Sequence, residues 1–244
     1  MSSFGPVAPY YDLLMAAVPY RMWVEYVKLL LEMQDYQPTQ WLDVACGTGT
    51  CAEMLAMDGH QVTGFDLSPS MIERAKSKLS GRPFSIDYHV ADAREFDLGT
   101  KFQAAYCLFD SLNYINDLDG FRAAIAQVAK HLQPGGAFVF DLNTAYAFEQ
   151  ELFTQQDLRK RTTLQYDWVG NYVPETRQIR VEMDFWYEGE QFHETHLQRA
   201  HSPEEVIQAL KDAGFVRHQA YHSYTLKKPR KNSDRIHYVA WIPS

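Results

Sequence analysis

The sequence predicts a doubly wound α/β fold, in which helices cover both faces of a parallel sheet, with a small antiparallel β insert. Apolar, strand-like segments alternate with helix-like segments between residues 40 and 153, an order that implies crossover connections between parallel strands. A glycine-rich turn at residues 47–49 joins the first of these strands to a helix. After residue 160, strand-like segments follow one another without helices, which is typical of an antiparallel sheet.

The elements of the expected core follow in order along the chain. Pro19 suits the first turn of a helix over residues 20–34, and Trp23, Val27 and Leu30 fall on one side of that helix. Five strands of the sheet are expected at residues 40–45, 60–67, 85–92, 102–109 and 136–143. The helices between and after them are expected at residues 50–57, 69–80, 118–132 and 145–153.

The second part of the chain divides into an insert and the end of the core. Three insert strands are expected at residues 162–169, 178–187 and 190–200. Ser202 and Glu205 then form a capping box for a helix that ends at Gly214. The last two strands, at residues 215–226 and 235–242, form a hairpin. We therefore assign residues 1–159 and 201–244 to the core and residues 160–200 to the insert.

Composition narrows the classes of function. The chain of 244 residues has a formal net charge of −8, which disfavours a polyanionic partner. The exception is the basic segment 227–235, interpreted as a solvated hairpin loop, with a nucleic-acid patch as the alternative. No apolar run reaches the roughly 20 residues of a membrane span, and no basic segment precedes an apolar one at the start, so a cytoplasmic protein is expected. The three cysteines lack disulfide or metal spacing.

The glycine-rich turn raises the question of which nucleotide cofactor it holds. The stretch WLDVACGTGTCAEML, residues 41–55, fits the Gly-x-Gly-x-x-Ala fingerprint of dinucleotide sites. However, Asp43 lies at the end of the strand, where a carboxylate would repel a pyrophosphate and attract a cation. S-adenosylmethionine carries an ammonium and a sulfonium group and no phosphate. Gly47 and Gly49 would let the backbone turn tightly beside it.

Two further acids are expected at the same edge of the sheet. Asp66 and Asp92 end the second and third strands, and ligands of open α/β sheets bind outside the carboxyl ends of the strands. Asp66 can accept both ribose hydroxyls, and Asp92 can accept the adenine amino group. Asp66 alone fits NAD equally well, whereas Asp43 and Asp92 together favour S-adenosylmethionine.

Five segments together resemble a known family. DVACGTGT, FDLSPSMIERA, VADARE, CLFDSLNYI and LQPGGAFVFDLN resemble, in order and spacing, the motifs of class I S-adenosylmethionine-dependent methyltransferases. The resemblance implies a Rossmann-like sheet of seven strands with the last one antiparallel. It implies a methionyl site at Asp43, Ala45, Gly47 and Gly49, a ribose site at Asp66 and Leu67, an adenine site at Met71, Asp92 and Ala93, and Phe109 near the sulfonium.

A nearer resemblance involves the beginning of the chain. The segment APYYDLLMAAVPYRMW is similar to that of small bacterial methyltransferases with an antiparallel insert, a group that includes amino-sugar and small-amine N-methyltransferases. The resemblance implies that Tyr11 and Trp23 fold over the methionyl end of the cofactor. The alternative for both residues is core packing of an amphipathic helix.

The acceptor end of the site is less well defined. HETHLQRAH, residues 193–201, lacks the His-x-x-x-His spacing of a zinc-protease helix, and no metal is expected. In a strand, His193, Arg199 and His201 share one face while His196 points the other way. Arg199 and His201 are candidates for lining the acceptor pocket, with a solvated face as the alternative. Asn113, beside the expected methyl group, caps a turn in the alternative interpretation.

The function that these features favour is methyl transfer from S-adenosylmethionine to a nitrogen or oxygen atom of a small molecule, by in-line displacement. Tyr11, Arg199, His201 and Asn113 are the candidate catalytic residues, and no general base is assigned. The insert is expected to cover the acceptor, whereas its aromatic side chains alternatively form a homodimer interface. The competing functions are a nucleic-acid methyltransferase, and an NAD-dependent oxidoreductase or a non-catalytic protein that binds a nucleotide cofactor.

Overall fold

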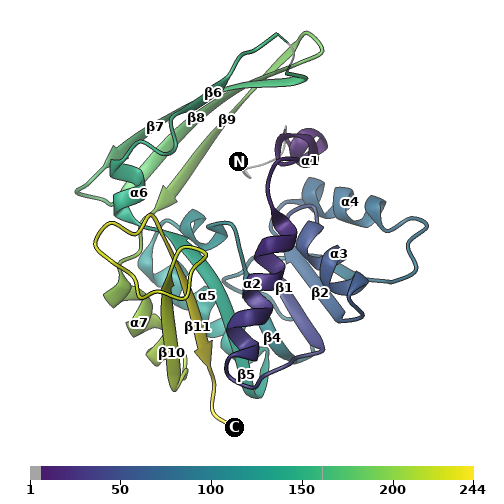
Figure 1. Ribbon diagram of the computed structural model, residues 1–244, viewed down its shortest axis with the longest axis vertical. Helices are drawn as coiled ribbons and strands as arrows, with labels where there is room; N and C mark the ends of the chain where they lie inside the picture. Colours follow the sequence, from purple (N-terminus) through teal and green to yellow (C-terminus); the bar gives the residue numbers. More distant parts are fainter. Residues whose placement is uncertain (1–6, 161) are drawn as a thin grey trace.

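The computed structural model describes residues 7–160 and 162–244, which form a seven-stranded sheet and a separate four-stranded sheet (Figure 1). Residues 1–6 and 161, which fall within the predicted core and insert, lie outside the described residues. The strands of the larger sheet are β1 (Gln40–Val44), β2 (Gln61–Asp66), β3 (Asp87–Val90), β4 (Phe102–Cys107), β5 (Leu132–Asn143), β10 (Arg217–His222) and β11 (Arg235–Trp241). Their spatial order is β10-β11-β5-β4-β1-β2-β3.

The topology confirms the predicted fold class. Strands β1 to β5 pair in parallel, whereas β11 runs antiparallel to β5 and to β10. The chain moves from β1 outward to β2 and β3, and then returns to the other side of β1 with β4. This reversal between β1 and β4 is the point at which doubly wound sheets bind ligands.

Helices cover both faces of the sheet, as the alternation of elements predicted (Figure 1). They are α2 (Tyr20–Glu32), α3 (Thr50–Met57), α4 (Pro69–Lys78), α5 (Leu118–Lys130) and α7 (Pro203–Asp212). The apolar side of α2 packs with α3 against one face, and α5 and α7 pack against the other. The capping box of Ser202 and Glu205 is present at the start of α7. These packed faces hold the strand ends of the larger sheet in place.

Several predicted boundaries need correction. Pro19 is the N-cap of α2 rather than its first helical residue. Strand β5 begins at Leu132 rather than at residue 136, because the chain continues through Gly135, at φ 74°, with a register shift against β4. Short elements that periodicity does not reveal are η1 (Ala8–Tyr10), α1 (Tyr11–Leu14), η2 (Ser111–Tyr114) and α6 (Ala145–Glu149).

The smaller sheet is an antiparallel meander, and it contains one strand more than predicted. Its strands are β6 (Gln155–Asp157), β7 (Leu164–Val173), β8 (Gln178–Tyr187) and β9 (Glu190–Arg199). Alternate residues of β8 are buried, from Ile179 to Phe185, and they form an apolar cluster with Phe148. Tyr10 and Tyr11 pack against this cluster. The beginning of the described chain therefore contacts the insert as well as the core.

The helices of residues 7–160 and 162–244 are all too short or too polar to cross a membrane.

Candidate functional site

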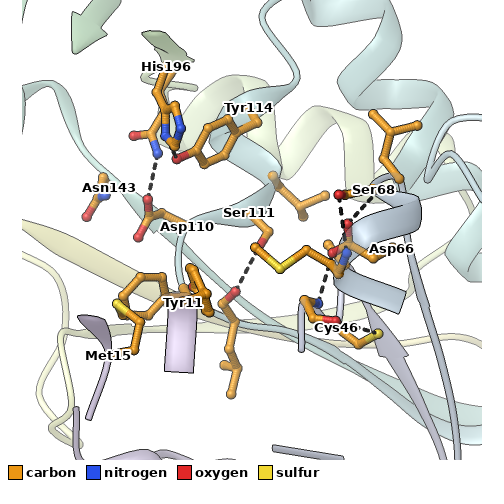
Figure 2. A pocket seen from close by; sticks show the side chains of 18 of the residues that line it. Tyr11, Met15, Cys46, Asp66, Ser68, Asp110, Ser111, Tyr114, Asn143 and His196 are labelled. Carbon is orange, nitrogen blue, oxygen red and sulfur yellow. Dashed lines mark hydrogen bonds between the residues drawn. The ribbon is translucent and has the colours of Figure 1, made fainter. Parts of the chain in front are cut away.

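A cavity of about 930 Å³ lies at the carboxyl edge of the larger sheet. It extends from the ends of β1, β2 and β4 to side chains of β8, β9 and β11. Figure 2 shows Asp66 and Cys46 on one side of this cavity, with Tyr114, Asn143 and His196 on the other. Small-molecule sites usually occupy roughly 300–1,000 Å³, so the cavity lies near the upper end of that range.

The turn after β1 is shaped by left-handed backbone conformations. Ala45, Gly47 and Gly49 have φ values of 57°, 54° and 77°. A Cβ atom on Gly49 would overlap the hydroxyl of the buried Tyr88, whereas one on Gly47 would meet nothing within 4 Å. Ala45 and Gly47 line the cavity, but Gly49 does not. A glycine is therefore needed at position 49, because Tyr88 packs under the turn and leaves no room for a side chain.

Asp66 ties the turn after β1 to the start of α4. Its two carboxylate oxygens accept hydrogen bonds from Gly47 N at 2.9 Å and from Ser68 N at 2.8 Å (Figure 2). Burial raises the pKa of Asp66, and these backbone donors oppose the rise. Each oxygen has a second acceptor position. Because Asp66 lines the cavity, it can receive hydroxyl donors from a ligand.

Asp43 is a buried carboxyl group on the cavity wall. Only 3% of the residue is exposed, and its Oδ2 atom has no hydrogen-bond partner among the described residues. Burial raises its pKa to about 8. An isolated buried carboxylate is unfavourable, and a nearby cation favours its charged form. The site therefore suits a cationic ligand such as the ammonium or sulfonium of S-adenosylmethionine.

Asp92 lies at the rim of the same part of the cavity. Arg94 holds its carboxylate through two side-chain nitrogens at 2.5–3.1 Å, and these bonds lower the pKa of Asp92. Leu67, Met71 and Ala93 line the adjoining wall. The structure thus brings together Asp66 and Asp92, predicted from the sheet edge, with Leu67, Met71 and Ala93, which the family resemblance implied.

The segment that includes α1 is fastened over the glycine-rich turn. Asp12 accepts hydrogen bonds from Thr48 Oγ1 at 2.6 Å and from Arg74 Nε at 3.0 Å, and Lys78 Nζ lies 3.5 Å away. This anchor brings Tyr11 into the cavity wall. Sequence reasoning missed Asp12, although it lies inside the Tyr-Asp-x-Leu-Met segment on which the resemblance rests.

Two aromatic residues predicted near the methionyl end also line the cavity. Trp23 stacks on Tyr224 with ring centroids 5.4 Å apart and contacts Phe109 at 5.0 Å. Phe109 and the next residue, Asp110, both have left-handed backbone conformations, at φ 66° and 50°. Non-glycine residues in this region are strained and cluster at functional sites. The strained turn after β4 directs Asp110 into the cavity.

Asp110 belongs to a buried group of charged residues at the far end of the cavity. Its carboxylate accepts hydrogen bonds from Arg235 Nη2 at 2.8 Å and from Gln198 Nε2 at 2.7 Å. Arg235 also donates to Asp141. Two carboxylates thus share one guanidinium. Sequence reasoning missed this group, because its members are far apart in the chain and only the folded structure brings them together.

The structure corrects the predictions for Arg199 and His201, neither of which lines the cavity. Arg199 pairs with Glu205 at 2.7 Å, and His201 stacks on Phe121 at a centroid distance of 4.1 Å. The error lay in the choice of strand face. On β9, the alternate residues Glu194, His196 and Gln198 are the buried ones, and His196 and Gln198 line the cavity.

Asn113 also lies outside the cavity lining. Its side chain donates to the carbonyls of Asn143 and Arg199 at 3.0 and 2.9 Å and accepts from Asn143 N at 3.0 Å. It therefore braces η2 against β5 and β9. The neighbouring Tyr114 lines the cavity together with Ser111 and Leu112 of η2, and it contacts His196.

No group of three or more potential metal-ligating side chains occurs within residues 7–160 and 162–244. His193, the first histidine of the HETH sequence, lies on the outer face of β9. It contacts Asp184 and Glu182, both at 2.9 Å.

Comparison with known proteins identifies the family. Residues 42–136 match a family model described as a methyltransferase domain. YqeM of Bacillus subtilis, which is named as a methyltransferase, is 31% identical over 242 residues, covering 96% of this chain and 94% of that protein. A dTDP-3-amino-3,4,6-trideoxy-alpha-D-glucopyranose N,N-dimethyltransferase of Streptomyces venezuelae is 35% identical over 112 residues, 46% of each chain.

The similarity to solved structures extends over the whole chain. The crystal structure of an S-adenosylmethionine-dependent methyltransferase from Clostridium acetobutylicum matches with a TM-score of 0.85 and 26% identity, covering 99% of each chain. The matching domain includes the glycine-rich turn and Asp66, around which the cavity is built. The chain belongs to the class I S-adenosylmethionine-dependent methyltransferases.

Proposed function

We propose that this methyltransferase transfers the methyl group of S-adenosylmethionine to a nitrogen or oxygen atom of a small polar molecule. The observation that carries the proposal is the composition of the cavity. One end is lined by residues suited to the cofactor, and the other end by the buried polar side chains of Asp110, Asn143 and Gln198. Both substrates would therefore share one cavity.

The residues that would hold the cofactor lie in the segment before β1 and between β1 and η2. Asp66 would accept the ribose hydroxyls, and Asp43, with Ala45 and Gly47, would face the methionyl part. Asp92, Leu67, Met71 and Ala93 would surround the adenine, with Tyr11, Trp23 and Phe109 nearer the sulfonium. When bound, S-adenosylmethionine supplies a methyl group on a positively charged sulfur, with a neutral thioether as the leaving group.

The acceptor would lie against Asp110, Asn143 and Gln198. These side chains line the cavity and are at most 6% exposed. Gln198 Oε1 and Asn143 Nδ2 have no hydrogen-bond partner among the described residues. An acceptor with both donor and acceptor groups would satisfy these atoms, which otherwise carry a desolvation cost of about 1–3 kcal/mol each. This chemistry favours a polar molecule over an apolar one.

The insert would cover the acceptor. Trp168, Met183, Phe185 and His196 contribute to the cavity wall from three insert strands. The contribution of these strands supports a role for residues 160–200 in excluding water and aligning the nucleophile, which favour an in-line displacement. The relative from Streptomyces venezuelae is named for an amino-sugar substrate, which agrees with a small polar acceptor.

A comparison of separate substrate classes tests this proposal. Full-length protein is incubated with methyl-labelled S-adenosylmethionine and, separately, with D-glucosamine, ethanolamine, catechol and bulk tRNA. Methylation of one of the small molecules at a nitrogen or oxygen atom is expected, with inversion at a chiral methyl group. Labelling of tRNA without labelling of any small molecule would contradict the proposal, as would retention at the methyl carbon.

A further inference from the structure

Three side chains from η2 and β9 form a continuous hydrogen-bonded chain that leads away from the cavity. Tyr114 Oη lies 2.8 Å from His196 Nδ1, and His196 Nε2 lies 2.7 Å from Glu194 Oε2. Tyr114 and His196 line the cavity, whereas Glu194 lies behind them. Figure 2 shows the Tyr114 hydroxyl directed toward His196, on the same side of the cavity as Asp110.

The contacts of Glu194 determine the direction of this chain. Its other oxygen, Oε1, accepts a hydrogen bond from Val7 N at 2.8 Å. When Glu194 is ionised, its carboxylate can only accept hydrogen bonds, and His196 then carries a proton on Nε2 and donates a hydrogen bond to Glu194. In the neutral imidazole, Nδ1 is then an acceptor. Tyr114 must therefore donate its hydroxyl hydrogen to His196.

We propose that Tyr114, His196 and Glu194 form a proton relay for the methyl acceptor, an inference that rests on the proposed function. As the acceptor atom bonds to the methyl carbon, the carbon–sulfur bond breaks and its electron pair stays on sulfur. The acceptor proton passes to Tyr114 Oη while the phenol proton passes to His196 Nδ1. The imidazolium that forms is paired with Glu194. Tyr114 is a catalytic residue in this scheme, and Glu194 is a positioning residue.

The surroundings of Tyr114 favour a concerted relay. Burial raises the pKa of Tyr114, and the carboxylate of Asp110 raises it further. A free tyrosinate is therefore unfavourable at this position, and the phenol must lose one proton as it gains another. His196 is the hydrogen-bonded base that can receive that proton.

The relay also accounts for the burial of His196 and Glu194. They are 2% and 6% exposed, and buried ionisable groups require partners. Val7, η2 and β9 meet at this chain, so the fastening of the first described residues onto Glu194 would orient His196. Docking of the segment around Val7 against the insert would therefore also position the residues of the relay.

The tautomer of His196 tests the geometry without any methyl acceptor. Full-length protein is labelled with ¹⁵N-histidine, and the His196 resonances are assigned by their loss in His196→Gln. The expected result is a neutral Nε2–H tautomer whose Nδ1 resonance shows hydrogen bonding that disappears in Tyr114→Phe. His201→Gln, which changes a buried histidine outside the cavity, should leave the His196 resonances in place. An Nδ1–H tautomer of His196 would overturn the relay.

Steady-state kinetics tests the chemistry, with the small molecule among D-glucosamine, ethanolamine and catechol that the wild type methylates fastest. Tyr114→Phe and His196→Gln should lower kcat about 100-fold or more, the usual scale of general acid–base catalysis. Glu194→Gln should lower kcat less and should mix the His196 tautomers. Affinity for S-adenosylhomocysteine and the activity of His201→Gln should remain within about twofold of wild type.

These experiments distinguish failure of the relay from failure of the proposed function. Wild-type kcat in Tyr114→Phe would overturn the relay and leave the proposed function standing. If the wild type methylates none of the three molecules, the proposed function fails for them, and the His196 tautomer still decides whether the relay geometry exists. An equal loss of S-adenosylhomocysteine binding in all three relay variants would assign these residues a structural role and overturn the proposal.

Discussion

The cavity has a cofactor end, around Asp43 and Asp66, and a proposed acceptor end, around Asp110 and Gln198. The contacts at these two ends join residues that are separated by very different distances along the chain. At the cofactor end, Asp66 joins Gly47 across 19 residues, within one strand–helix–strand unit. At the acceptor end, Gln198 and Arg235 reach Asp110 across 88 and 125 residues. The cofactor end is therefore specified by local spacing, whereas the acceptor end depends on how the insert and the last strand pack on the core.

The largest expected effect is a difference in stability between alanine substitutions at Gly49 and Gly47, two glycines of the turn after β1. Gly49→Ala should destabilise the protein by roughly 2–4 kcal/mol, because its Cβ would overlap the buried Tyr88 hydroxyl and overpacking adds to left-handed strain. Gly47→Ala, with open space around it, should cost only the strain of about 1–2 kcal/mol. Urea unfolding of both variants measures the difference, and equal losses would argue against Gly49 as a packing residue.

The next effect concerns charge at the cofactor end. With a pKa of about 8, Asp43 is mostly protonated at pH 6, and a cationic ligand that requires the carboxylate binds less well there. Affinity for S-adenosylhomocysteine should therefore rise by up to about tenfold per pH unit between pH 6 and pH 8. Calorimetry at several pH values measures this slope. Asp43→Asn should bind more weakly at pH 8 and lose most of the slope, and an unchanged slope would assign the pH dependence to another group.

The smallest effect separates the two faces of β9 at the acceptor end. Arg199→Ala removes a partly exposed ion pair with Glu205 and should cost about 1 kcal/mol of stability, with methyl transfer unchanged. Gln198→Ala, on the adjacent residue, should raise the KM for the acceptor. Chemical unfolding and steady-state kinetics on the two variants provide the comparison. A loss of turnover in Arg199→Ala at full cofactor affinity would place the acceptor on the other face.

The difference between the two ends also explains what the sequence could predict. The strand alternation was sufficient for the fold. The spacing of Asp43, Asp66 and Asp92 was sufficient to place these three residues at one edge of the sheet, because parallel strand ends must meet there. The period of two in β9 correctly separated His196 from Arg199. It could not indicate which face looks inward, because that depends on the packing of β9 against η2.

Other parts of the site had no signal that could be read locally. Asp12 reaches Thr48 only when α1 folds back over the glycine-rich turn. The strained conformation of Asp110 follows β4 in a segment without glycine. Strand β6 has only three residues, too few for a recognisable alternation. In each case tertiary contacts, rather than local preference, determine the conformation.

The separation of the two ends is tested most directly by calorimetric titration of S-adenosylhomocysteine into two variants. Asp66→Ala should lose about 1.5–3 kcal/mol of binding free energy, as expected for charged hydrogen bonds, or roughly 10- to 150-fold in Kd. Gln198→Ala should bind S-adenosylhomocysteine within about twofold of wild type. A large loss in Gln198→Ala, or an unchanged Kd in Asp66→Ala, would contradict the assignment of the two ends.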